Sequence, residues 1–139
     1  MPYLDHAATT PLRPEVLEAM LPHLREAHGN PSSLHREGRL ARVAVDQARE
    51  RVASVLGCEP GEVVFTSGGT EADNLALRGV LTGAALRQTG RPGLVTSAVE
   101  HHAILHTAEA LAADGHRVAI LDAPAGVLAP ADVASALTE

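Results

Sequence analysis

Two glycines flanked by hydroxyl side chains make the stretch from Ser67 to Thr70 chemically distinctive. The stretch lies between a short apolar run and a segment with helical spacing. Free amides at the start of a helix bind phosphate, and glycine lets the backbone turn sharply and approach an anion closely. The sequence therefore predicts an anion site at Gly69 and Thr70. The alternative is that Thr70 only caps the helix while Asp73 returns the bond.

Adjacent histidines, His101 and His102, follow a second apolar run. A flat imidazole can stack on a heteroaromatic ring or move protons near neutral pH. The alternative for His101 is a hydrogen bond to a backbone group at a helix start. His102 and His106 have a spacing seen in metal ligands, but no third ligand follows at a diagnostic spacing, so we expect no metal site. The chain also lacks a P-loop lysine and a GxGxxG pattern, which disfavours nucleoside triphosphates and dinucleotides.

The elements that must position these residues alternate between strand and helix. Apolar runs predict strands at residues 62–66, 94–96 and 118–121. Helical spacing predicts helices at residues 70–86 and 101–113, and a last helix from about Pro130. This alternation is typical of an open, mostly parallel α/β sheet covered by helices on both faces. Ligands of such sheets bind beyond the carboxyl ends of the strands, so we expect residues 67–70, residues 100–102 and Asp122 at one edge.

The N-terminal part of the chain predicts helices rather than strands. Pro14 suits the first position of a helix, which Pro22 should kink or split. After a loop, a long helix carries an apolar stripe between residues 41 and 56 and ends at Gly57. We therefore expect an N-terminal segment with long helices at residues 1–60 and a βαβαβ part at residues 61–139, together one incomplete domain.

Composition narrows the classes of function. The formal charge of −6, without a basic cluster, favours neither nucleic acid nor an anionic membrane as a partner. The chain has no cationic start followed by an apolar run and no stretch long enough to span a membrane, so we expect a cytoplasmic protein. A lone cysteine, Cys58, cannot form an internal disulfide. All 11 Lys/Arg positions are arginine, so the chain has no lysine.

Four sequence blocks, in order, resemble those of cysteine desulfurases, which belong to the class V aminotransferase group of fold-type I pyridoxal-phosphate enzymes. The blocks are YLDHAATTP from Tyr3, GNPSSLH from Gly29, VVFTSGGTEADNLAL from Val63 and VEHHAIL from Val99. The resemblance runs from Tyr3 to the last residue. It implies the N-terminal part of the large domain of such an enzyme.

The resemblance also implies roles for three residues. Gly69 and Thr70 match the pair that binds the phosphate of pyridoxal 5'-phosphate. His101 matches the histidine that stacks over the pyridine ring and assists proton transfer. The implied reaction takes sulfur from L-cysteine, leaving L-alanine and an enzyme persulfide. The sulfur then passes to an acceptor protein for iron–sulfur cluster or thiocofactor synthesis, and the enzymes of the family are homodimers.

The implied reaction needs a lysine that holds the cofactor covalently and a cysteine on a mobile loop. The family carries both downstream of the part matched here, and we expect Cys58 to be structural. The chain is therefore expected to be an inactive N-terminal fragment of a desulfurase. The alternatives are a fragment of a selenocysteine lyase or another class V enzyme, and a short binding module without catalysis. A stop codon directly after Glu139 would count against a fragment.

Overall fold

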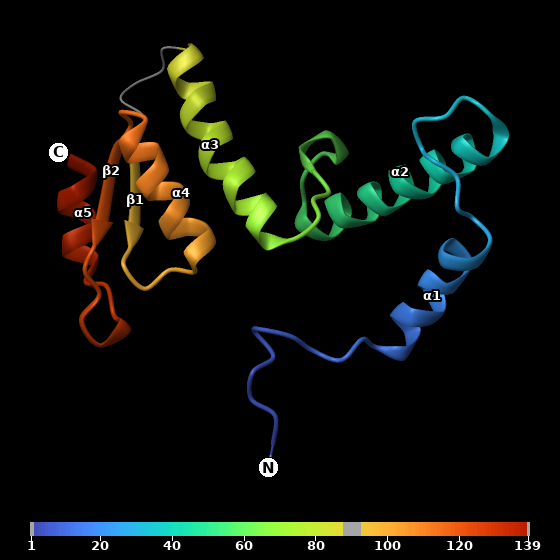
Figure 1. Cartoon of the computed structure of the whole chain (residues 1–139), viewed down its shortest axis with the longest axis horizontal. Coiled ribbons are helices and arrows are strands. Elements are labelled where there is room, and N and C mark those ends of the chain that lie inside the picture. Colours follow the sequence, from blue (N-terminus) through green and yellow to red (C-terminus); the bar gives the residue numbers. More distant parts are fainter. Residues whose placement is uncertain (1, 88–92, 139) are drawn as a thin grey trace. The chain divides into compact units, whose positions relative to one another are not determined.

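The computed structural model describes residues 2–87 and 93–138 (Figure 1). The backbone divides into two compact units, Met1–Val64 and Phe65–Glu139. None of the helices in the described ranges is both long enough and apolar enough to span a membrane.

The first unit is helical. It contains α1 (Pro14–Arg25), α2 (Arg36–Leu56) and the short 3-10 helix η1 (Pro60–Glu62). Pro14 begins α1, and the helix continues through Pro22 to Arg25, so of the predicted kink or split the split is wrong. Pro22 cannot donate a backbone hydrogen bond, yet its carbonyl still accepts the N–H groups of Glu26 and Ala27 at 2.9 and 3.0 Å. The last turn of α1 therefore closes.

Both ends of α2 have specific caps. At the start, the Nδ1 atom of His35 accepts the backbone N–H of Gly38 at 3.3 Å. At the end, Gly57 adopts the left-handed conformation with φ of 69°, and its N–H bonds to the carbonyl of Ala53. Glycine takes this conformation without a steric penalty, so the predicted end at Gly57 is confirmed.

The segment after η1 does not form the strand predicted at residues 62–66. Val63 is extended, with φ of −91° and ψ of 121°, but no strand in the described ranges pairs with this segment. Val64 and Phe65 remain 64% and 49% exposed. A strand needs the backbone groups of a neighbour, and apolar composition does not supply them. The prediction of a strand is therefore wrong for this structure.

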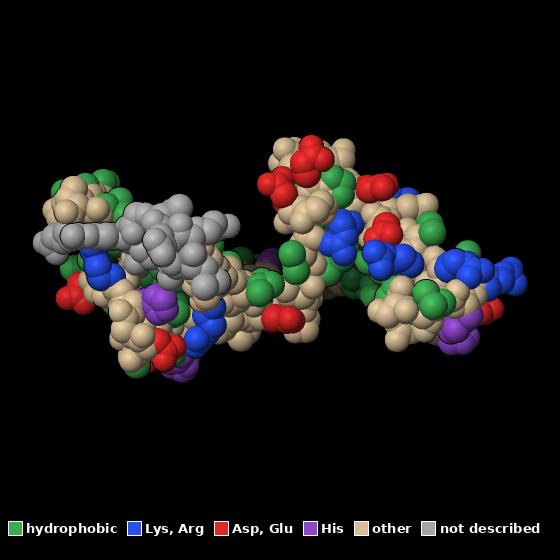
Figure 2. Space-filling view, turned by 90° about the horizontal axis from the view of Figure 1, so that it is seen from above, with side chains coloured by type: hydrophobic (Ala, Val, Ile, Leu, Met, Phe, Trp, Pro, Cys, Tyr) green, Lys and Arg blue, Asp and Glu red, His purple; other side chains and the backbone are tan. Residues whose placement is uncertain are grey.

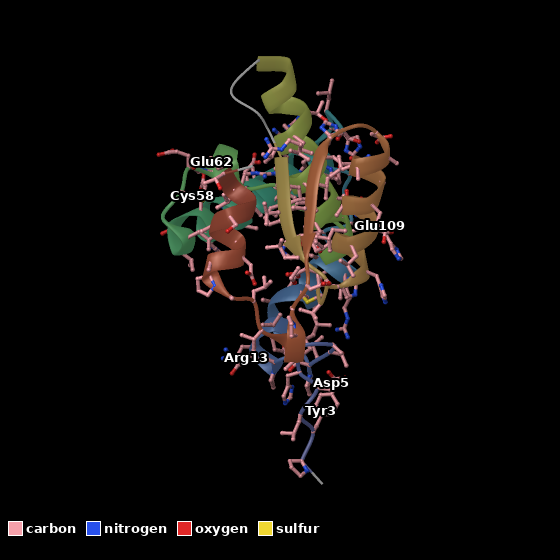
Figure 3. All side chains as sticks on the ribbon, turned by 90° about the vertical axis from the view of Figure 1, so that its left-hand side faces the viewer. Tyr3, Asp5, Arg13, Cys58, Glu62 and Glu109 are labelled. Carbon is pink, nitrogen blue, oxygen red and sulfur yellow. The ribbon has the colours of Figure 1, made fainter. Side chains whose placement is uncertain are left out.

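The second unit has the predicted α/β character. Its elements are α3 (Gly69–Arg87), β1 (Gly93–Ser97), α4 (His102–Ala113), β2 (Arg117–Leu121), η2 (Pro124–Gly126) and α5 (Pro130–Thr138). The two strands pair in parallel, in a register that runs from Gly93 opposite Arg117 to Ser97 opposite Leu121. Helices α4 and α5 lie on opposite sides of the strands (Figures 1 and 3). The predicted α/β class with parallel pairing is confirmed.

The core of the second unit lies where α4 packs against α3 and the strands. Its buried apolar side chains are Leu81, Ala103, Ala108 and Leu111. Leu111 is 2% exposed, and Ala108 is fully buried. Alanine lets α4 approach its neighbours closely, while Glu109 projects from the side of α4 turned away from the strands (Figure 3). The core thus fixes which face of α4 points toward α3.

Candidate functional site

The glycine-rich turn before α3 is held by one carboxylate. Glu71 accepts the backbone N–H of Ser67 at 2.6 Å and the Ser67 hydroxyl at 2.7 Å, both through Oε2. The side chain that reaches back across the first turn is therefore Glu71. The predicted alternative, in which Asp73 returns the bond to a capping Thr70, is wrong in its choice of carboxylate. Thr70 itself lies within α3.

These hydrogen bonds lower the pKa of Glu71 below its ordinary value. The backbone N–H of Ser67 is the largest cause, followed by the Ser67 hydroxyl, and burial opposes them weakly. Both donors favour the charged form of the carboxylate. Glu71 is therefore ionised at neutral pH and engaged with the turn.

The first backbone amides of α3 point into the turn without partners in the helical ladder. The ladder begins where the N–H of Ala72 bonds to the carbonyl of Gly68 at 3.1 Å. The N–H groups of Gly69, Thr70 and Glu71 precede that bond, so they have no acceptor within α3. Gly69 also has open space where a side chain would stand. The turn therefore offers several N–H donors and the Thr70 hydroxyl on one exposed surface.

His101 caps α4. Its backbone is extended, and its Nδ1 atom accepts the N–H of Ala103 at 3.1 Å. Because Nδ1 accepts, the neutral ring carries its proton on Nε2. The predicted alternative, in which His101 hydrogen-bonds to a backbone group, therefore holds for its Nδ1 atom. His101 is exposed, and its ring centroid lies 6.2 Å from that of His102.

The loop that leads to His101 is fixed from the strand side. Ser97 is buried and donates its hydroxyl to Oε1 of Glu100 at 3.0 Å. The N–H of Ala98 bonds to the carbonyl of Leu121 at 2.8 Å, which extends the pairing of β1 and β2 by one bond. The end of β1 therefore positions the start of α4.

An open hollow of about 360 Å³ between α3 and α4 brings Thr70 and His101 together. It is lined by Thr70, Asn74, Arg78, His101, His102, Ala103, His106 and Thr107. Gly69 does not line the hollow but precedes Thr70 in the same turn. Asp122 lines a separate hollow with residues of α5. The turn at residues 67–70 and the loop at residues 100–102 thus meet at one site, whereas Asp122 does not join them.

Three polar residues of the hollow, Asn74, Arg78 and Thr107, were not predicted from the sequence. Asn74 lies one helical turn after Thr70, so its spacing was a usable signal. Thr107 could not be placed without knowing which faces of α3 and α4 meet. His102 and His106 stack with ring centroids 5.2 Å apart, and the described residues contain no cluster of three or more metal-ligating side chains.

The chain matches a known protein family over nearly its whole length. The model for the family described as aminotransferase class-V matches residues 2–139. The chain belongs to this family. Its four sequence blocks predicted that membership, which is confirmed.

Similar proteins include curated cysteine desulfurases. The chain is 47% identical to cysteine desulfurase IscS of Dictyoglomus turgidum over 136 residues, which are 97% of this chain and 34% of that protein. It is 43% identical to cysteine desulfurase IscS of Methanosarcina thermophila over 138 residues, covering 99% and 33%. The chain thus spans about a third of the length of these relatives.

Solved structures similar to this chain have the same fold. A NifS-like protein superimposes with a TM-score of 0.72 at 38% identity, over 82% of this chain and 30% of that one. SspA in complex with cysteine superimposes with a TM-score of 0.79 at 37% identity, over 97% and 38%. The predicted fold, part of the large domain of a pyridoxal-phosphate enzyme, is therefore confirmed.

Proposed function

We propose that this chain forms the phosphate-binding and ring-stacking part of the pyridoxal 5'-phosphate site of a cysteine desulfurase. The observation that carries the proposal is the hollow shared by Thr70 and His101. The relatives are cysteine desulfurases, and class V aminotransferases depend on this cofactor. Residues 61–139 then belong to the cofactor-binding part of the enzyme, preceded by the helical segment at residues 1–60.

The residues present fit the two chemically distinct parts of the cofactor. A phosphate needs several hydrogen-bond donors, and the amides of Gly69 and Thr70 with the Thr70 hydroxyl provide them. The positive end of the α3 dipole also favours an anion there. A flat pyridine ring needs a flat partner, and the exposed imidazole of His101 lines the same hollow. The donor set thus matches a phosphorylated heteroaromatic ligand better than a sugar phosphate.

Glu71 does not compete for the proposed phosphate site, because its carboxylate is hydrogen-bonded to Ser67. Its Oε2 atom accepts both donors of Ser67. A carboxylate that capped the first N–H groups of α3 would compete with the phosphate. Because Ser67 holds Glu71, the amides of Gly69 and Thr70 remain available for the ligand.

His101 has two roles in this proposal, ring stacking and proton transfer. Its Nδ1 atom is bound by Ala103, which fixes the orientation of the ring for stacking. Its Nε2 atom holds the proton of the neutral ring and is the position from which a proton can be given or taken. Bound pyridoxal phosphate supplies an electron-withdrawing ring that stabilises negative charge on the substrate carbon.

The anchoring lysine of the proposed reaction has to come from outside these residues, because the chain contains none. The cysteine that takes sulfur from L-cysteine is likewise assigned outside them, since Cys58 follows the capping Gly57 of α2. From the resemblance to cysteine desulfurases, we also propose that the whole enzyme is a cytoplasmic homodimer with a sulfur-acceptor protein as its partner.

The test is an assay of the longer protein that contains this sequence. With L-cysteine, it should release alanine and, in the presence of a reductant, sulfide. The chain alone, given cofactor and cysteine, should release no more sulfide than free cofactor does. Alanine production from selenocysteine only, or none at all from the cofactor-loaded protein, would contradict the proposed reaction.

A further inference from the structure

A continuous line of hydrogen bonds joins the two halves of the candidate site. The side-chain N–H of Asn74 donates to the carbonyl of Thr70 at 2.9 Å. The Thr107 hydroxyl lies 2.7 Å from Oδ1 of Asn74 and 2.8 Å from the carbonyl of Ala103. The N–H of Ala103 donates to His101 at 3.1 Å. The line thus runs from the phosphate end of α3 to the ring at the start of α4.

The chemistry of each group fixes the direction of these bonds. Only the amide nitrogen of Asn74 can donate to the Thr70 carbonyl, so its Oδ1 must face Thr107. The Thr107 hydroxyl must then be the donor, and its single proton is shared between Oδ1 of Asn74 and the carbonyl of Ala103. Thr107 is 3% exposed, so water does not readily replace it.

We propose that Asn74 and Thr107 are positioning residues that set the distance between the phosphate contacts at Gly69 and Thr70 and the stacking ring of His101. The inference rests on the proposed function. Without the bridge, each end could still bind its part of the ligand. With it, α3 and α4 present both parts at one separation, which lowers the cost of ordering the site on binding.

Thr107→Val tests the bridge with almost no change in size, and Thr107→Ser tests it by keeping the hydroxyl while losing one methyl group. Valine removes the hydroxyl and leaves Oδ1 of Asn74 without its donor, whereas serine keeps the hydroxyl. Thr82→Val, at an exposed position of α3, is the matched control for the loss of a threonine hydroxyl. The probe is pyridoxamine 5'-phosphate. This probe has no aldehyde, so it cannot bind covalently to the terminal amine. The chain contains no lysine that could offer a second amine.

Binding of the probe to the full chain is followed by fluorescence titration and by the circular dichroism induced in its absorption band. Loss of one such hydrogen bond predicts about three- to tenfold weaker binding for Thr107→Val. It also predicts a changed induced signal at saturation, which a loss of stability alone would not produce. Thr107→Ser and Thr82→Val should behave like the parent chain. Equal affinity and equal induced signal for valine and serine at position 107 would overturn the inference.

Hydrogen exchange separates this inference from the proposed function. In the chain without probe, Thr107→Val should speed exchange of the Asn74 side-chain amide and of the Ala103 backbone N–H, and Thr107→Ser should not. If the parent chain failed to bind the probe, the proposed function would fail, and these exchange rates would still decide whether the bridge exists. Unchanged exchange in Thr107→Val would refute the bridge.

Discussion

The two units of the chain differ in what their helices pack against. In the first unit, the long helix α2 buries only Gly38 and Ala53, and α1 buries no residue. In the second, α4 buries Ala103, Thr107, Ala108 and Leu111 although it is shorter. Figure 2 shows hydrophobic side chains interspersed with charged ones over the surface of the first unit. An apolar stripe therefore makes a core only where a second layer lies on it, and the candidate site lies in the unit that has this layer.

Among the changes that test this difference, Leu111→Ala should lower the free energy of unfolding the most. The side chain is 2% exposed, and its loss should lower the free energy of unfolding of the second unit by about 2–5 kcal/mol. The same change at Leu56 in α2, which is 70% exposed, should cost less than about 0.5 kcal/mol. Urea titrations of both variants check this. Equal losses would mean that the two units do not differ in packing as described.

Gly38→Ala should test a close backbone approach at the start of α2 in the first unit. A side-chain carbon at Gly38 would stand 2.3 Å from the carbonyl oxygen of Ser33. Because that atom belongs to the backbone, the loop must shift, at a cost of about 1–3 kcal/mol. Gly61→Ala is the control, since nothing lies within 4 Å of its added carbon. Amide exchange at the start of α2 is measured in both variants. Identical exchange rates in Gly38→Ala and Gly61→Ala would contradict the close approach.

Gly79→Ala should stabilise the second unit. Gly79 lies inside α3, with nothing within 4 Å of an added side-chain carbon. Alanine removes the entropic cost of a glycine within a helix, which predicts a gain of about 0.5–1 kcal/mol. Thermal unfolding followed by circular dichroism should show a higher midpoint. A lower midpoint would mean that this face of α3 is covered.

The smallest expected effect is a pH response shared by both units. The pKa of Glu71 is lowered chiefly by the backbone of Ser67. The pKa of Glu37 is lowered chiefly by its own backbone N–H; burial opposes this, and His35 adds to the lowering. A lowered folded pKa gives stability that is present above the ordinary value of 4.5 and is lost as the pH falls through the folded pKa.

NMR titration of the two carboxylates measures this response. Both midpoints should lie below 4.5, and His35→Ala should raise that of Glu37 while leaving that of Glu71 unchanged. A midpoint of Glu71 at or above 4.5 would show that Ser67 does not hold it.

Local patterns in the sequence predicted most elements, because caps and spacing act within a few residues. Gly57, Pro14 and the runs at β1 and β2 are examples. That residues 62–66 would not form a strand was not predictable, since apolar composition does not show whether a partner strand is present. The candidate residues Thr70 and His101 could be named from the turn chemistry and the family blocks. The bridge through Asn74 and Thr107 could not, because it depends on how two helix faces meet.

If Thr70 and His101 form one site, a single ligand should report on both, and an NMR titration of the full chain with pyridoxamine 5'-phosphate measures this. The amides of Gly69 and Thr70 and the ring of His101 should shift together along one binding curve. Inorganic phosphate should shift only the amides, and Thr70→Ala should weaken both responses. Independent binding curves for the turn and the ring, or no shift at His101, would contradict a single site.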